Sequence, residues 1–104
     1  MLSSMKGRPF SIQGDLTLFG TPVKSLGNLQ SVEGSLNLSG LKIKTLSHLK
    51  SVGKNLNLIF SKIENLGDLE YIGGSLYATH CPIAENYTKK QIREKIKIKG
   101  EIFI

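Results

Sequence analysis

The chain has 104 residues, a formal net charge of +6 and a hydrophobic fraction of 39%. A chain of this length is expected to form one domain, and its hydrophobic fraction is too high for a disordered chain of this charge. No apolar run approaches the roughly 18 residues of a membrane-spanning helix, and the first ten residues contain no apolar signal core. The single cysteine, Cys81, excludes an internal disulfide. We therefore expect a cytoplasmic protein without a membrane partner.

The chain divides into an N-terminal cap at 1–10, repeats at 11–83 and a C-terminal cap at 84–104, all within one domain. Apolar residues recur every twenty positions in six columns. A period this short predicts a solenoid, in which each repeat buries its apolar face only against its neighbours. The columns are Ile12, Val32, Val52, Ile72 and Ile92; Leu16, Leu36, Leu56, Leu76 and Ile96; Leu18, Leu38, Leu58, Ala78 and Ile98; Val23, Ile43, Ile63 and Ile83; Leu26, Leu46 and Leu66; and Leu29, Leu49 and Leu69.

Each repeat has two halves with different apolar spacing. One half alternates apolar and polar residues, which is typical of a strand. The alternation predicts five parallel strands, at 15–18, 35–38, 55–58, 75–78 and 95–98. In the other half the apolar residues are three apart, as in Leu26, Leu29 and Val32, which predicts an irregular or 3₁₀-like return path. Gly14, Gly34 and Gly74 precede their strands and are expected to form the bend into the sheet. In the third repeat the glycine is one place earlier, at Gly53.

The C-terminal cap is predicted to contain a helix and then a strand. Thr88 and Gln91 have the spacing of a capping box. Ile92 and Ile96 follow one helical turn apart, so both can face the core and cover the end of the solenoid. The segment 95–104 alternates isoleucines with lysines at its start, and this pattern predicts a closing strand with one buried face.

Segments such as "LNLSGLKI" and "LNLIFSKI" resemble the repeat segment L-x-L-x-x-N-x-L of the leucine-rich repeat family. The Asn column of that family here reads Thr21, Leu41, Ser61 and Cys81, and Leu41 departs from the pattern. The ending "YIGGSLYATHCPIAENYTKKQIREKIKIKGEIFI" resembles that of small repeat proteins encoded by bacteriophages and related mobile elements. The resemblance implies an α/β solenoid with a leucine-rich-repeat parallel sheet of about five strands. It also implies an inhibitor of a host machine, such as an anti-defence or anti-CRISPR protein in the host cytoplasm.

The adjacent pair His80 and Cys81 raises the question of metal or thiol chemistry. Structural zinc needs four ligands in recognisable pairs, and the other histidine, His48, lies in a different column. The sequence has no phosphate-binding loop, nucleophile elbow or H-E-x-x-H motif. We therefore expect no catalytic residues, no metal and no cofactor.

The residues between the inward leucines of each strand are expected to face outward. Most are small and polar, but Phe19, Ile59 and Tyr77 are not. Exposed aromatic residues on a rigid sheet are typical of binding hot spots, although single exposed apolar residues are ordinary. The predicted partner-binding residues are Phe19, Asn37, Asn57, Ile59, Tyr77, Thr79 and His80.

A second candidate surface is the basic C-terminal end. Its residues are Lys89, Lys90, Arg93, Lys95, Lys97 and Lys99. Such a cluster is suited to phosphate in RNA, DNA or a ribonucleoprotein. Alternatively, lysines on a terminal strand protect a sheet edge against pairing with other chains.

Three functions are consistent with these features. The first is non-catalytic binding of a host protein or ribonucleoprotein through the sheet face and the basic end. The second is direct binding of RNA or DNA. The third is self-association through the last strand, although the lysines favour a monomer over an edge-strand dimer.

Overall fold

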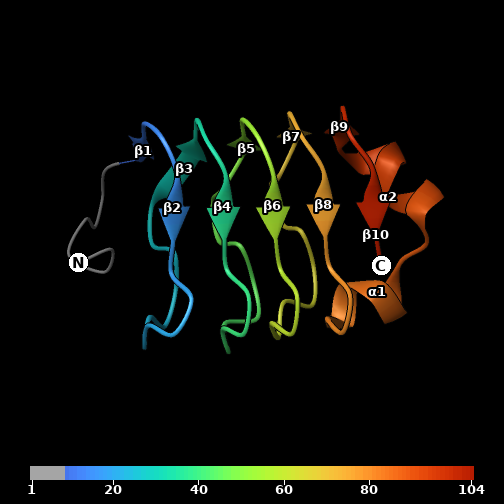
Figure 1. Cartoon of the computed structure of the whole chain (residues 1–104), viewed down its shortest axis with the longest axis horizontal. Coiled ribbons are helices and arrows are strands. Elements are labelled where there is room, and N and C mark those ends of the chain that lie inside the picture. The colour runs from blue at the N-terminus through green and yellow to red at the C-terminus, as the bar shows by residue number, and fades with distance from the viewer. Residues whose placement is uncertain (1–8) are drawn as a thin grey trace.

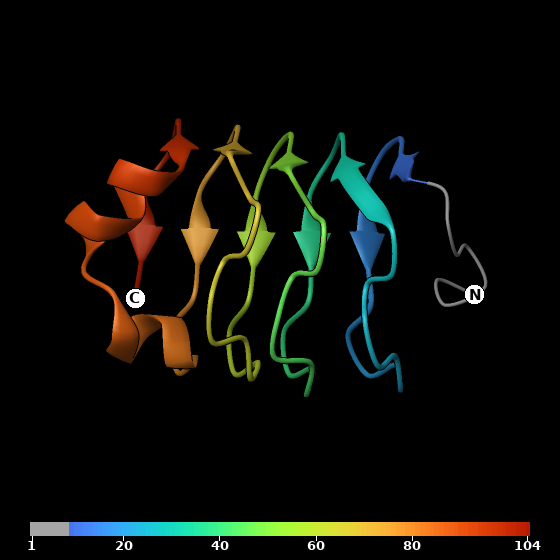
Figure 2. The same ribbon diagram turned by 180° about the vertical axis from the view of Figure 1, so that it is seen from behind.

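The computed structural model describes residues 9–104, which stack turn upon turn along one axis as a parallel β-solenoid (Figure 1). Each central turn advances the chain by twenty residues, because Leu16 pairs with Leu36 and Leu36 pairs with Leu56. Figure 2 shows the same stack from behind, with the two helices at its C-terminal end. Most of the predicted N-terminal cap lies outside the described residues.

Two five-stranded parallel sheets run the length of the stack. Sheet A has the strand order β1 (Phe10–Ile12), β3 (Leu29–Val32), β5 (Ser51–Val52), β7 (Tyr71–Ile72) and β9 (Lys97–Ile98). Sheet B has the order β10 (Ile102–Phe103), β8 (Leu76–Tyr77), β6 (Leu56–Asn57), β4 (Leu36–Asn37) and β2 (Leu16–Thr17). The first four predicted strands therefore lie in sheet B.

Sheet A corrects the prediction of a single sheet with an irregular or 3₁₀-like return path. The return half of each turn contains a short parallel strand that pairs with the strand of the next turn. Leu26, Leu29 and Val32 are three positions apart and are nevertheless all buried. The reason is a change of chain direction at Gly27, which lies between Leu26 and Leu29 and has φ 57°. The extended strand that follows then turns Leu29 and Val32 inward. Spacing alone does not distinguish this turn-plus-strand from a 3₁₀ path.

The core lies between the two sheets and is built from the apolar columns. The central residues Leu36, Leu38, Leu56 and Leu58 are all fully buried, as the period predicts. Burying one such side chain contributes roughly 1.5–3 kcal/mol. Each central turn has neighbours on both sides, and the stack therefore supplies the core that no single repeat can form.

The corner from sheet A to sheet B brings successive turns into close backbone contact. Gly53 N donates to Val32 O at 2.8 Å. A Cβ at Gly53 would collide with the Glu33 carbonyl oxygen, and one at Gly73 would collide with the Gly53 carbonyl oxygen. The predicted role of glycine at this bend is confirmed for Gly34 and Gly74, where a Cβ would likewise collide with the preceding turn. At Gly14 the cause is different, because its φ is 88° and a Cβ would meet no neighbour.

A ladder of side chains links the turns beside this corner. Asp15 Oδ1 accepts from Ser35 N at 2.8 Å, and Asn55 Oδ1 accepts from Ser75 N at 2.9 Å. Ser35 Oγ and Ser75 Oγ accept from the next turns at 3.2 and 3.0 Å. These residues had the appearance of solvated polar positions, but they stabilise the register. By contrast, Leu41, in the column aligned with the family asparagine, is buried in the core.

The C-terminal cap contains α1 (Pro82–Asn86) and α2 (Lys89–Lys95). The predicted capping box is present: Gln91 N donates to Thr88 Oγ1 at 3.1 Å, and Thr88 N donates to Gln91 Oε1 at 2.9 Å. Ile92 and Ile96 are buried, so α2 covers the end of the core. Neither helix of the described residues is long or apolar enough to cross a bilayer.

The predicted strand at 95–98 is wrong. Lys95 ends α2, whereas Ile98 belongs to sheet A and pairs with Ile72. The fifth strand of sheet B is instead β10, in which Ile102 pairs with Leu76. The helix lengthens the last turn, and the twenty-residue offset therefore fails there. The segment 95–104 is not one strand, because it bends between β9 and β10.

Candidate binding surface

The turns that follow β2, β4, β6 and β8 of sheet B each have a residue with a left-handed backbone. At this position Gly20 has φ 77° and Gly40 has φ 74°, whereas Phe60 and His80 have φ 61° and 57°. Glycine adopts these angles without steric conflict. A bulky residue there is strained. The third and fourth turns therefore place large rings where the first two turns have glycine.

The rings of Phe60 and His80 stack on each other. Their centroids are 4.6 Å apart and their planes differ by 5°. The stack forms because equivalent residues of successive turns face each other along the axis, as the hydrogen bond from Phe60 N to Thr79 O shows (3.2 Å). Phe60 is 63% exposed, and His80 is also exposed. The pair thus presents aromatic surface to the outside.

Phe19 extends the same edge across the second turn. A Cβ placed on Gly40 would lie 3.7 Å from Phe19 Cε1, so the ring of Phe19 lies beside the bare backbone of Gly40. Phe19 is 67% exposed. Rings from the first, third and fourth turns therefore lie along this edge. We call Phe19, Phe60 and His80 the aromatic edge.

A second stack lies on the outer face of sheet B. Tyr77 and Phe103 are register partners, with ring centroids 4.8 Å apart and planes 8° apart. Phe103 is 43% exposed and Tyr77 is half-buried. The predicted residues Ile59 and Thr79 are half-buried and adjoin the aromatic edge in sequence.

The two predicted asparagines have local partners. Asn37 Oδ1 accepts from Ser39 N at 3.0 Å, and Asn57 Oδ1 accepts from Ile59 N at 3.0 Å. Each amide thus closes the turn that follows its strand. Both residues are half-buried on the outer face of sheet B. Contact with a partner remains a prediction for them.

Two residues of the basic end have partners within the cap. Arg93 Nη1 donates to Ile98 O at 2.9 Å, and Arg93 Nη2 donates to Gly100 O at 2.8 Å. Lys95 Nζ lies 5.5 Å from the centroid of the Tyr87 ring, a cation–π distance. Arg93 therefore holds the bend between β9 and β10.

The other four basic residues are exposed but come from different elements. Lys89 and Lys90 lie in the first turn of α2, and Lys97 lies on β9 of sheet A beside Tyr71. Lys99 follows in the corner, where its N–H donates to Ile72 O at 3.0 Å. The predicted alternation of three lysines along one strand is thus wrong, because Lys95 belongs to a helix.

The side chains of Cys81 and His80 lie in different environments. Cys81 is buried, with Sγ 3.4 Å from Ser61 Oγ and 3.3 Å from Ile63 O, to which the thiol donates. His80 lies outside against Phe60. Within residues 9–104, no three His, Cys, Asp or Glu side chains gather as metal ligands would.

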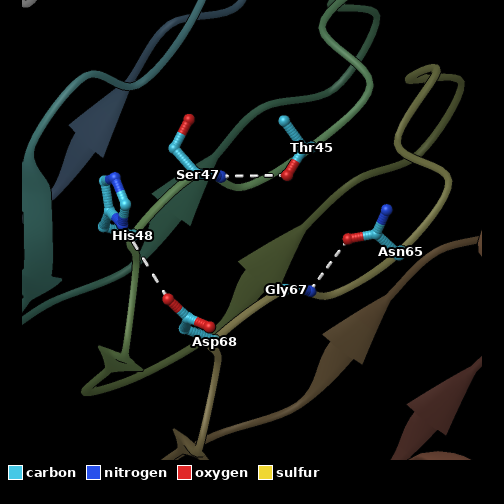
Figure 3. Close-up of polar contacts among 6 residues, drawn as sticks. All are labelled: Thr45, Ser47, His48, Asn65, Gly67 and Asp68. Carbon is cyan, nitrogen blue, oxygen red and sulfur yellow. Dashed lines mark hydrogen bonds and ion pairs between the residues drawn. The ribbon is translucent and has the colours of Figure 1, made fainter.

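The turns that precede β5 and β7 carry a polar cluster, shown in Figure 3. Thr45 Oγ1 accepts from Ser47 N at 3.2 Å, and Asn65 Oδ1 accepts from Gly67 N at 3.0 Å. These bonds close the two tight turns. His48 Nδ1 lies 3.8 Å from Asp68 Oδ2, which belongs to the next turn of the solenoid. Both side chains are largely exposed, and such a pair contributes little to stability. The cluster is explained as turn structure.

No protein-family model, curated protein or solved structure matches this chain. Its function is therefore inferred from the geometry and chemistry of its surface. The prediction from sequence missed Phe60 as a surface aromatic, although Phe60 has a sequence signal, because its column begins with Gly20 and Gly40. The alternation along 95–104 places Phe103 on the outward face, and Phe103 is exposed. Its stacking on Tyr77 has no sequence signal, because that register depends on the helix inserted before it.

Proposed function

We propose that this protein is a non-catalytic binding module whose partner is a protein or a ribonucleoprotein. The aromatic edge carries the proposal. A left-handed backbone is less favourable for a non-glycine residue by roughly 1–2 kcal/mol. Phe60 and His80 both have this backbone conformation, and both rings are exposed. Strain retained at an exposed position is a feature of functional sites.

The chemistry of the edge favours a protein surface as the partner. Large rings that bury in a partner pocket dominate the energy of protein interfaces. The stack already restricts the rings of Phe60 and His80, so little side-chain entropy remains to be lost on binding. The rigid stack of turns keeps the rings at fixed spacing.

The proposal extends to architecture and biological role. The twenty-residue repeat supports a short leucine-rich-repeat architecture, and the resemblance of the C-terminal sequence to phage proteins supports an inhibitor of a host machine. The partner would then be a nuclease or ribonucleoprotein of host defence, such as a CRISPR complex, in the host cytoplasm. Both extensions rest on sequence resemblance.

Capture of the partner from a bacterial lysate, followed by titration of variants, tests the proposal. Phe60→Ala and His80→Ala should each weaken binding by about 1–3 kcal/mol, which is roughly 5- to 150-fold in Kd. Tyr71→Ala is the matched control, because it removes a half-buried ring from the outer side of sheet A. Unchanged affinity of both edge variants for the captured partner would refute the role of the edge.

Direct binding of RNA or DNA is the second candidate. It is favoured by Lys89 and Lys90, which are exposed and form no ion pair among the described residues. In that case each lost phosphate contact lowers the slope of log affinity against log salt by about one unit. Charge reversal at both lysines, titrated at two salt concentrations, distinguishes the candidates. Sedimentation of the free protein separates a monomer from an edge-strand dimer.

A further inference from the structure

The solenoid has a third side, formed by the extended segments 21–24, 41–44 and 61–64. Lys62 N donates to Leu41 O at 3.0 Å and Glu64 N donates to Lys44 O at 2.9 Å, so the second and third turns are in register. Alternate residues, such as Ile43 and Ile63, are buried in the core. The residues between them face outward. We call the outward lysines of these segments the lysine side: Lys24, Lys42, Lys44 and Lys62.

The lysines of this side are stacked on one another. Lys24 and Lys44 share one column, and Lys42 and Lys62 share another. Successive turns of such a stack are about 4.8 Å apart, and like charges directly opposite each other are destabilising. Among the described residues, none of these ammonium groups forms an ion pair with a carboxylate. Glu64 follows Lys24 and Lys44 in their column and is the one carboxylate of these three segments, so four lysines and one glutamate leave the side with a net charge of +3. This excess of positive charge attracts an anion.

A groove opens on the lysine side between the first two turns. No backbone hydrogen bond joins 21–24 to 41–44 among the described residues, in contrast to the next pair of turns. The groove has a volume of about 560 Å³, within the range of ligand sites. Its side-chain lining consists chiefly of four apolar residues and two lysines. They are Pro22, Val23, Leu41, Ile43, Lys24 and Lys42.

We propose that this groove binds an extended acidic segment of a partner protein. One apolar side chain of the segment contacts Val23 and Leu41, and flanking carboxylates pair with Lys24 and Lys42. Lys44 and Lys62 continue the positive charge along the segment.

The lining favours a peptide over a nucleic acid. Among the described residues that line the groove, none is aromatic. Phe19 lies at its border beside Gly40, but a single ring offers one stacking position, whereas single-stranded nucleic acid is held by several. The groove has aliphatic side chains next to two lysines. A peptide with a leucine or valine between glutamates is complementary to it, because its apolar side chain can contact the aliphatic residues while its carboxylates pair with the lysines. The inference goes beyond the proposed function, because it assigns a second surface with its own ligand. It stands whether or not the aromatic edge binds.

Fluorescence anisotropy with the full chain tests this proposal. The probe is a fluorescein-labelled heptapeptide with leucine at its centre and glutamate at every other position. Replacing the leucine by serine should weaken binding at least several-fold. The double substitution Lys24→Glu with Lys42→Glu should weaken it at least tenfold. The matched control, Lys89→Glu with Lys90→Glu, makes the same charge change on α2 and should leave it within twofold.

Further variants and a competing ligand test the specificity of this binding. If the Lys24→Glu, Lys42→Glu double variant does not fold by circular dichroism, Lys24→Gln with Lys42→Gln takes its place. The Phe60→Ala, His80→Ala variant should bind the peptide as the parent does, which separates this site from the aromatic edge. Absence of peptide binding, indifference to the leucine, or equal loss in the α2 control would each overturn the proposal. So would tighter binding of a single-stranded oligonucleotide that depends on Lys24 and Lys42.

Discussion

The left-handed backbone of Phe60 leads to a quantitative prediction about the free energy of unfolding of two variants at this position. Phe60→Ala removes the stack with His80 but keeps a non-glycine residue at φ 61°. Phe60→Gly removes the stack and also relieves the backbone. The two variants differ only in the Cβ, so their difference in unfolding free energy reports the backbone strain less the extra conformational entropy of glycine in the unfolded chain.

The expected difference follows from two opposing effects. Relief of the left-handed strain favours the glycine variant by about 1–2 kcal/mol. The larger conformational entropy of glycine in the unfolded chain opposes this by about 0.4–1 kcal/mol. The net of the two ranges runs from about 0 to about 1.6 kcal/mol in favour of the glycine variant, with a midpoint of about 0.8 kcal/mol. Relative to the parent, the alanine variant should lose about 0.5–1.5 kcal/mol, the contribution of a stacked aromatic pair.

Urea unfolding followed by far-ultraviolet circular dichroism measures this difference. With an m-value of about 2 kcal/mol/M, the midpoints should differ by about 0.4 M. Gly40→Ala is the matched control in the preceding turn, because its Cβ would meet only ordinary contact with Phe19 at 3.7 Å. That variant should be less stable than the parent by a similar amount.

The strain argument fails if Phe60→Ala is more stable than Phe60→Gly with equal m-values. It fails also if Gly40→Ala is more stable than the parent, since the two positions share the same left-handed region of backbone angles. In either case the exposed rings of the third and fourth turns would carry no stability cost, and the principal support for the proposed binding surface would be lost.

Three further variants test the core and the cap. Leu56→Ala should lower the free energy of unfolding by about 2–5 kcal/mol and Tm by at least about 8 °C; a change of only a degree or two would contradict the stacked core. Arg93→Lys should lose at least one of two carbonyl hydrogen bonds and about 1 kcal/mol, with faster amide exchange in β10, whereas unchanged exchange would show that the guanidinium does not hold the bend. Cys81→Ser should change stability by less than about 1.5 kcal/mol, because a hydroxyl can donate to the same carbonyl; elemental analysis that finds stoichiometric zinc in the parent and none in the variant would contradict the thiol's structural role.

The sequence by itself determined the solenoid, the inward columns and the start of α2. The twenty-residue period places Leu36 above Leu56 wherever the repeat is unbroken, and burial then selects the apolar face. The capping box at Thr88 is local, because its bonds join residues only three positions apart. Such features need no knowledge of distant segments.

Only the tertiary structure decided the second sheet, the last register and the composition of the surfaces. The sequence did not predict the strands of sheet A, because a tight turn followed by a short strand gives the same apolar spacing as a 3₁₀ path. The final register changed because α2 lengthens one turn and carries Ile98 and Ile102 to the columns of Ile72 and Leu76. The stack of Tyr77 on Phe103 exists only in that shifted register. Contacts between turns depend on the chain length within each turn, so a single inserted helix moves every column beyond it.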